Sequence, residues 1–278
     1  GAAAARRHAT SRNAEVSRLL RASSIFLATA LALAAPAAAD TAGGTASVDD
    51  IVARHLKACG GLKKIRAIQT LRETGRIAAG ADRQALVTRE RKRPNLTRFE
   101  FTVQGVTSVF VSNGERGWKM SPFEGNEGPT ALPEEVIGEA SEQGDIEGPL
   151  VDWKAKGHQV ELVGREDIDG HAAYKLKLTL KSGAVRYEFL DARTFYRLRT
   201  VATRQLHGRP VQIEATFSDY RKTDGVPFPH RIEVAASGRP QHLIVTVDTV
   251  EVNPPLSDSL FEMTESSQPT SNQPSQLE

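Results

Sequence analysis

The sequence lacks the features that would assign a function class directly. It has one cysteine, Cys59, among 278 residues, which excludes a disulfide framework and any metal site built from several cysteines. Its 36 Lys and Arg against 34 Asp and Glu leave a net charge of +2, too small to create a field that attracts nucleic acid. Hydrophobic residues make up 39% of the chain. That fraction supports a folded core but not a polytopic membrane protein.

Sequence motifs for catalysis are also missing. The chain contains no G-x-S-x-G elbow, no H-E-x-x-H pair and no P-loop. The histidines are scattered, and none stands at ligand spacing from a second histidine or from the cysteine. Cys59 has no general base near it in the sequence, so a thiol nucleophile would depend on partners brought in by the fold. The sequence therefore predicts no catalytic residues, no metal site and no cofactor.

The first 39 residues have the pattern of a secretory signal peptide. Several arginines precede an apolar run from Ile25 to Ala35, and Pro36 and Ala37-Ala38-Ala39 follow it. The run is too short to cross a bilayer core of about 30 Å, although an uncleaved anchor is the alternative. We expect a periplasmic protein with a signal peptide at 1–39 and a linker at 40–46. The folded domain is expected at 47–263, followed by a disordered tail at 264–278 that is rich in Ser, Gln, Pro and Thr.

The hydrophobic pattern predicts one helix followed by many strands. Ser47 caps a helix whose apolar residues recur at helical spacing until Gly60-Gly61. From Thr70 onward the period changes to that of strands, and turn residues such as Asn113-Gly114 separate the runs. The predicted strands are Thr70–Ala78, Gln84–Lys92, Leu96–Gln104, Val106–Ser112, Arg116–Met120, Gln159–Arg165, Ala172–Leu180, Ala184–Leu190, Tyr196–Leu206, Val211–Arg221, His230–Ala235 and His242–Val252. Short turns between most of them predict an antiparallel meander.

Residues 121–157 interrupt this pattern. The segment is rich in Gly, Pro and Glu, and Pro133 is placed to open a helix. Long insertions in compact domains often act as lids or binding loops, whereas many others are surface excursions. Both interpretations stay open at the level of the sequence.

Long strands and few helices together favour a cavity. Sheets of such strands curl to protect their edges, and two helices cannot fill a large concave face. The residues expected to line the cavity are Phe99, Phe101, Val109, Trp118, Tyr174, Leu176, Leu178, Tyr187 and Phe189. Alternation places each short set on one face of its strand, but it does not say which face is concave.

Arginines gather on one pair of strands. Such side chains bind carboxylates or anionic head groups. The favoured interpretation is a solvated outer face on which they pair with Glu188 and Glu214. The arginines concerned are Arg186, Arg193, Arg197, Arg199 and Arg204.

Five segments resemble the periplasmic outer-membrane lipoprotein-sorting (LolA/LolB-like) superfamily. They are the helix that begins V-D-D-I-V-A-R-H-L at Val48, Y-K-L-K-L-T-L from Tyr174 with L-D-A-R-T-F-Y-R-L from Leu190, F-S-D-Y-R-K-T-D-G-V-P-F-P-H from Phe217, and V-E-V-N-P-P-L-S-D-S-L-F from Val250. The resemblance covers roughly residues 47–263. It implies a large curved antiparallel sheet that forms an unclosed β-barrel, with a helical lid over a hydrophobic cavity.

The resemblance also implies a function without catalysis. We expect a soluble periplasmic carrier that binds lipid or lipoprotein acyl chains, takes part in outer-membrane lipoprotein sorting and meets inner- or outer-membrane protein partners. Two alternatives stay open. One is a protein-binding or envelope-stress sensor module that uses the acidic insertion, and the other is an envelope hydrolase whose His and acidic residues meet only in the fold.

Overall fold

The computed structural model describes residues 46–80, 84–125, 128–206, 209–239 and 242–262. These residues cover almost all of the predicted domain at 47–263. The predicted signal peptide at 1–39, nearly all of the predicted linker and the predicted tail at 264–278 lie outside them.

A single antiparallel sheet dominates the domain, as the sequence predicted. Its order is β6-β5-β4-β3-β2-β1-β13-β12-β11-β10-β9-β8-β7, so the first and last strands of the meander meet in the middle. The edge strands β6 and β7 do not pair with each other, and the barrel is therefore unclosed. The strands are β1 (Thr70–Ala79), β2 (Gln84–Lys92), β3 (Leu96–Val103), β4 (Val106–Ser112), β5 (Gly117–Met120), β6 (Thr130–Ala131), β7 (Gln159–Ile168), β8 (His171–Thr179), β9 (Val185–Asp191), β10 (Arg197–Leu206), β11 (Arg209–Thr223), β12 (Val226–Ala236) and β13 (Leu243–Val252).

The central pair of the sheet depends on one glycine. The register between β1 and β13 shifts between Thr74 and Gly75, which is typical of a β-bulge. A Cβ atom on Gly75 would lie 2.0 Å from the carbonyl oxygen of Thr246. Any other residue would push the two strands apart at the point where the two halves of the sheet join.

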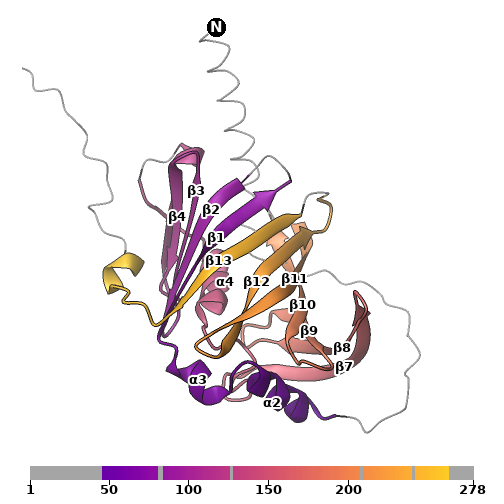
Figure 1. Cartoon of the computed structure of the whole chain (residues 1–278). Coiled ribbons are helices and arrows are strands. Elements are labelled where there is room, and N and C mark those ends of the chain that lie inside the picture. Colours follow the sequence, from indigo (N-terminus) through magenta and orange to yellow (C-terminus); the bar gives the residue numbers. More distant parts are fainter. Residues whose placement is uncertain (1–45, 81–83, 126–127, 207–208, 240–241, 263–278) are drawn as a thin grey trace, which may run out of the picture.

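Two short helices precede the sheet. Helix α2 (Val48–Ala58) begins at Ser47, whose hydroxyl accepts a hydrogen bond from the Asp50 amide at 3.1 Å. Its buried side chains Ile51 and Val52 pack in one cluster with residues of β7, β8 and β9. Helix α3 (Leu62–Ala67) follows directly and leads into β1. Figure 1 shows both helices across the lower end of the sheet.

The insertion between β5 and β7 contributes a third helix. Helix α4 (Glu134–Gly144) begins after Pro133, which lies one position before the helical residues. It contacts β3 and β4 and lies within the curve of the sheet (Figure 1). Short 3-10 turns at Pro122–Glu124 (η2) and Asp258–Phe261 (η3) complete the described elements. The insertion is thus part of the folded domain, and α4 covers part of the inner face.

The strand register shows which residues share the inner face. One row of cross-strand partners joins Leu176, Glu188, Thr200, Ala215, Val234 and Leu243. Another row joins Ser108, Phe101, Val87, Gly75 and Val247. Cross-strand partners point to the same side of a sheet. Both rows contain residues that line a cavity, so this face is concave.

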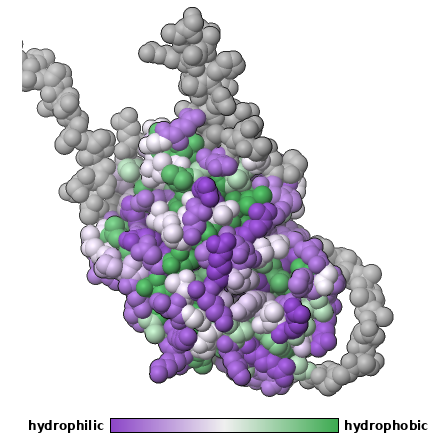
Figure 2. Space-filling view, in the orientation of Figure 1, coloured by the Kyte–Doolittle hydropathy of each residue, from purple (hydrophilic) through white to green (hydrophobic). Residues whose placement is uncertain are grey.

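The outer face carries its own smaller apolar clusters within a largely hydrophilic surface. Figure 2 shows hydrophilic residues over much of the visible face, with hydrophobic ones scattered among them. Among the described residues, no helix has the length and apolar character that a transmembrane span requires.

Candidate ligand-binding cavity

A cavity of about 560 Å³ lies between the concave face of the sheet and the helices. Its volume falls within the range of about 300–1,000 Å³ that is usual for small-molecule sites. Three phenylalanines on β3 and β4 form part of its apolar wall: Phe101 stacks on Phe110 at 6.0 Å and lies 6.3 Å from Phe99, measured between ring centroids. The facing wall comes from β11 to β13 and includes Ala215, Phe217, Ile232, Val234 and Val245.

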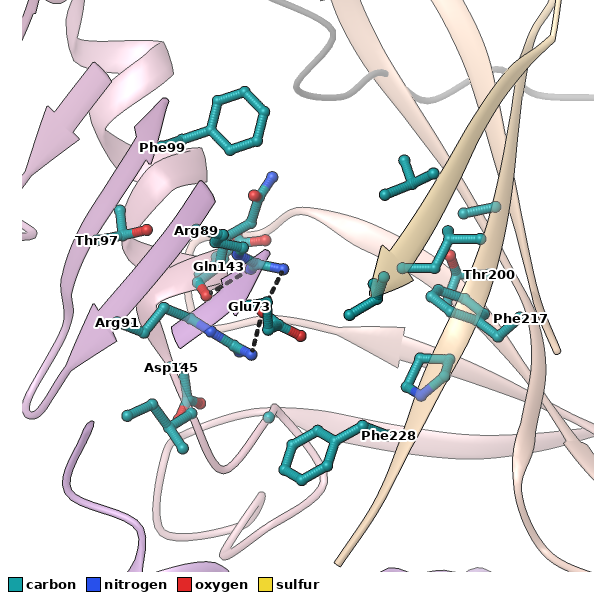
Figure 3. Close-up of a pocket in the computed structure, with 18 of the residues that line it drawn as sticks. Glu73, Arg89, Arg91, Thr97, Phe99, Gln143, Asp145, Thr200, Phe217 and Phe228 are labelled. Atoms are coloured by element: carbon teal, nitrogen blue, oxygen red, sulfur yellow. Dashed lines mark hydrogen bonds and ion pairs between the residues drawn. The ribbon is translucent and has the colours of Figure 1, made fainter. Parts of the chain in front are cut away.

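The cavity changes from apolar to charged along strand β2. Ala85, Val87, Arg89 and Arg91 alternate along this strand and all line the cavity. The two apolar residues lie at the start of β2, and the two arginines lie near its other end, level with the start of β1. Since β1 follows directly from α3, the charged part of the cavity is at the end that the short helices close. Figure 3 shows both arginines beside Glu73.

Glu73 is shared by two arginines. Its Oε2 atom lies 3.0 Å from Nη2 of Arg91 and 3.8 Å from Nη1 of Arg89. Burial alone would raise the pKa of Glu73, but Arg91 and Arg89 outweigh burial and hold it below its ordinary value. Burial and the charges of Arg91 and Arg197 lower the pKa of Arg89 to about 10, against the opposing effect of Glu73. Arg89 therefore stays charged at neutral pH, and it shares one carboxylate with Arg91.

A second ion cluster surrounds Glu188, and here the sequence-based interpretation was wrong. Glu188 is 1% exposed and lies on the inner face, not on a solvated outer one. Its carboxylate oxygens lie 3.3 Å from Nη2 of Arg186 and 3.9 Å from Nε of Arg197. The expected outer pairing is found only for Glu214, whose Oε1 lies 3.2 Å from Nε of Arg199.

A bulge in β10 explains why two arginines so close in sequence face opposite ways. Arg197 is opposite Leu190 and Arg199 is opposite Phe189, with a shift in register between them. Residues two apart on a regular strand share a face, but one extra residue reverses the direction of the side chain. Leu190 belongs to the cluster beneath α2, so its neighbour Arg197 points inward. The guanidinium of Arg197 lies over the ring of Phe217, 5.1 Å from its centroid.

Charged contacts hold α4 against the sheet. Arg204 lies 3.2 Å from Oε1 of Glu139 and 3.6 Å from Oε2 of Glu142. Arg89 donates a hydrogen bond to the backbone carbonyl of Gln143 at 3.0 Å. The last turn of α4 is therefore joined to β10 on one side and to β2 on the other.

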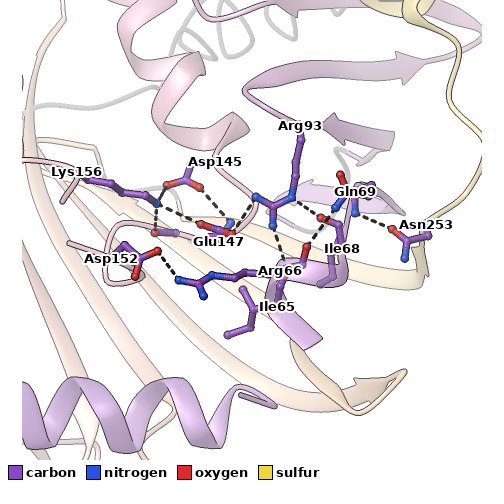
Figure 4. A network of polar contacts seen from close by, with 11 residues as sticks. Ile65, Arg66, Ile68, Gln69, Arg93, Asp145, Glu147, Asp152, Lys156 and Asn253 are labelled. Atoms are coloured by element: carbon purple, nitrogen blue, oxygen red, sulfur yellow. Dashed lines mark hydrogen bonds and ion pairs between the residues drawn. The ribbon is translucent and has the colours of Figure 1, made fainter. Parts of the chain in front are cut away.

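The loop after α4 lines the cavity and takes part in a network of polar contacts (Figure 4). Arg93 pairs with Glu147 at 3.0 Å and donates hydrogen bonds to the carbonyl oxygens of Ile68 and Ile65 at the end of α3. Lys156 pairs with Asp145 at 2.6 Å. These contacts neutralise the acidic residues of the loop and tie it to α3, so α3, α4 and the loop form a continuous cover.

The structure places the nine predicted lining residues in three different environments. Phe99 and Phe101 line the cavity. Tyr174, Leu176 and Leu178 lie on the same concave face, but Ile51 and Val52 of α2 pack on them, so they form core beneath the helix. The remaining four lie on the opposite face: Val109, Trp118, Tyr187 and Phe189.

Other residues of the chain pack over these four side chains on the outer face. Val109 and Trp118 pack with Leu256 and Phe261 of the C-terminal segment. Tyr187 and Phe189 lie beneath Lys175, whose ammonium is 5.2 Å and 5.5 Å from the two ring centroids. Alternating apolar residues thus occur on both faces of this sheet. The pattern predicts that a side chain is buried, but it does not predict that the side chain lines the cavity.

The fold brings Cys59 beside a base that the sequence analysis missed. His55 is one helical turn earlier on α2, and the Cys59 sulfur lies 3.7 Å from its Nε2. Nδ1 of His55 donates to the carbonyl of Phe195 at 2.8 Å. Burial lowers the pKa of His55 and raises the pKa of the Cys59 thiol to about 11. The pair is therefore neutral at pH 7, whereas a nucleophilic cysteine needs a thiolate.

No cluster of three or more His, Cys, Asp or Glu residues suited to a metal ion occurs in the described part of the chain. The cavity instead combines an apolar wall with half-buried arginines. Such a site binds a ligand by burying its apolar part and pairing its polar part.

The described residues thus form an unclosed antiparallel β-barrel whose concave face holds a ligand-sized cavity beneath helices. Known structures share this fold. A DUF1329 family protein from Desulfovibrio piger matches with a TM-score of 0.55 and 16% identity over 81% of this chain and 100% of its own. A putative outer membrane lipoprotein-sorting protein domain from Vibrio parahaemolyticus matches with a TM-score of 0.53 and 12% identity over 76% and 94%.

A LolA superfamily protein from Nitrosomonas europaea matches with a TM-score of 0.50 and 15% identity, over 75% of this chain and 96% of its own. The fold is therefore LolA-like, which confirms the resemblance drawn from the sequence. No family model matches the chain, and no curated protein matches it in sequence.

Proposed function

We propose that this protein is a periplasmic carrier that binds lipid or lipoprotein acyl chains in the cavity. The observation that carries the proposal is the apolar wall formed by β3, β4 and β11 to β13 beneath α4. The LolA-like fold supports it, because the structures that share this fold include a putative lipoprotein-sorting domain. The signal-peptide pattern at 1–39 supports export to the periplasm, where membrane-protein partners would deliver and receive the cargo.

Apolar burial alone provides enough affinity for such a role. Each buried methylene contributes about 0.8 kcal/mol, so ten contribute about 8 kcal/mol before the cost of immobilising the ligand. No covalent step is needed to retain the cargo or to release it. The neutral Cys59–His55 pair is consistent with binding rather than turnover.

The first test asks whether the protein carries an amphiphile. Protein exported to a bacterial periplasm would be examined by native mass spectrometry and by organic extraction. We expect a bound lipid of defined mass, removed by the extraction. A purified sample that binds one protein partner stoichiometrically and no lipid would favour the protein-binding alternative, and turnover of ester or glycoside substrates would favour the hydrolase.

The second test asks whether the ligand occupies this cavity. Ala215→Phe adds a ring on the concave face, whereas Thr216→Phe adds the same ring to the outer face of β11. N-phenyl-1-naphthylamine, a neutral fluorescent probe, would report binding. We expect Ala215→Phe to lose at least about tenfold in affinity, which is about 1.4 kcal/mol, and Thr216→Phe to bind as wild type does. Equal binding by both variants would refute the cavity as the site.

A further inference from the structure

The arginines of the cavity wall outnumber the carboxylates that face them. Five arginines border the space or its immediate wall: Arg89, Arg91, Arg186, Arg197 and Arg204. The carboxylates paired with them are Glu73, Glu139, Glu142 and Glu188. The other lining acids, Asp145 and Glu147, are neutralised by Lys156 and Arg93. His55 is neutral because burial lowers its pKa. One positive charge is left over.

The excess charge is concentrated around Glu73. Arg89 and Arg91 share its carboxylate, and the charge of Arg197 acts on Arg89 from the facing wall. Among the described residues, the Nε atoms of Arg91 and Arg197 are buried and make no hydrogen bond. Within the same part of the chain, Arg197 has one carboxylate at ion-pair distance, 3.9 Å away. A buried N–H donor without an acceptor is costly unless a further acceptor completes its contacts.

The position of these arginines fits the two parts of an amphiphile. Along β2 the cavity wall changes from Ala85 and Val87 to Arg89 and Arg91. On the facing wall, Arg197 lies over Phe217, whose cross-strand partner on β12 is Ile232, and the charge of Arg197 acts on Arg89. An extended ligand with its apolar chain against Val87 and Ile232 would therefore bring its head group to the arginines.

We propose, on the basis of the proposed carrier function, that the ligand has an acidic head group, a carboxylate or a phosphate, bound by Arg89, Arg91 and Arg197. The guanidinium fork suits both oxyanions, and the pairing would complete the unused donors. Neutral lipids of equal chain length would bind through the apolar wall alone and more weakly. The head group therefore selects among lipids that the apolar wall does not distinguish.

The test compares palmitate with methyl palmitate, which keeps the chain and removes the charge. Displacement of N-phenyl-1-naphthylamine would measure both affinities for the wild type, for Arg197→Gln and for Arg199→Gln. Arg199 is two residues away on the same strand, but on the outer face and paired with Glu214, which makes it a matched control. We expect wild type and Arg199→Gln to prefer palmitate by about tenfold or more, and Arg197→Gln to lose that preference while it binds the ester normally.

Further variants and ligands in the same displacement experiment distinguish the possible results. Arg91→Gln provides a second variant if Arg197→Gln melts early, and Arg197→Lys should retain part of the preference because it keeps the charge. Inorganic phosphate alone should not displace the probe; displacement at micromolar phosphate would mean that the site takes a free anion and would overturn the lipid assignment. Equal affinities for acid and ester in the wild type would overturn the head-group proposal and leave acyl-chain binding intact. Failure of both lipids and the probe to bind would refute the carrier function itself.

Discussion

Glu188→Gln tests whether the inner-face ion cluster is as buried as the structure shows. The substitution keeps the shape of the side chain and removes the negative charge that pairs with Arg186 and Arg197. Removing one partner of a buried pair costs about 3–5 kcal/mol. Arg186 keeps a distant partner in Glu142, at 4.0 Å, and Arg197 retains contact with the cavity. We therefore expect the free energy of unfolding to fall by an amount near the lower end of this range, about 3 kcal/mol.

The assay is urea unfolding monitored by tryptophan fluorescence, with thermal melting as a second measure. A loss of about 3 kcal/mol corresponds to about 6–12 °C in melting temperature for a domain of this size. Glu214→Gln is the matched control: its carboxylate also pairs with an arginine of β10, but on the solvent side, where such pairs contribute about 1 kcal/mol or less. Equal losses for the two variants would refute the assignment of Glu188 to a buried cluster.

The difference between wild type and Glu188→Gln should depend on pH in one direction. Burial alone would raise the pKa of Glu188, but Arg197 and Arg186 outweigh it and hold the pKa below 4.5, its ordinary value. The stabilisation is therefore complete above the unfolded-state pKa and is lost as the pH falls through the folded-state value. The two proteins should differ fully at pH 7 and converge in acid, and a constant difference down to about pH 3 would contradict this sign.

Three further predictions concern the helix α2 and its contacts. Ile51→Ala removes a fully buried side chain between α2 and the sheet, so unfolding experiments should show a loss of about 2–5 kcal/mol, while the exposed Lys57→Ala should change stability by less than about 0.5 kcal/mol. Cys59, with a thiol pKa of about 11, should resist iodoacetamide at about pH 8 in the folded protein and react in urea; rapid labelling of the folded protein would contradict the raised pKa of the thiol. Leu176→Glu should unfold the domain, measured as loss of the cooperative melt, because Leu176 is fully buried.

The strands were predictable because their signal is local. Alternating residues and turn residues such as Asn113-Gly114 suffice to place a strand, and each of the twelve expected strands is found, with small differences at the ends. The two-residue strand β6 was missed because two residues carry no period. The helix α4 was anticipated from Pro133, but its place on the concave face depends on contacts with β3 and β4, which no local pattern contains.

The cavity could not be predicted because a sheet of this kind buries residues on both faces. Leu176 and Phe189 belong to equally regular apolar alternations on neighbouring strands. The register shows that they point in opposite directions, since Leu176 is opposite Glu188 and Phe189 is opposite Lys175. Only the pairing between strands distinguishes the concave face, and the helix α2 then decides which part of that face becomes core. Phe99 and Phe101 escape that cover and line the cavity.

The arginines show most clearly why register matters for function. A regular β10 would have put Arg197 beside Arg199 on the outer face, where both would be ordinary surface charges. The bulge turns Arg197 inward and places its guanidinium 3.9 Å from a carboxylate that also pairs with Arg186. Apolar residues in place of a buried ion cluster would often stabilise a fold equally well or better. Stability alone therefore does not account for these arginines on the cavity wall, whereas the proposed recognition of an acidic head group would.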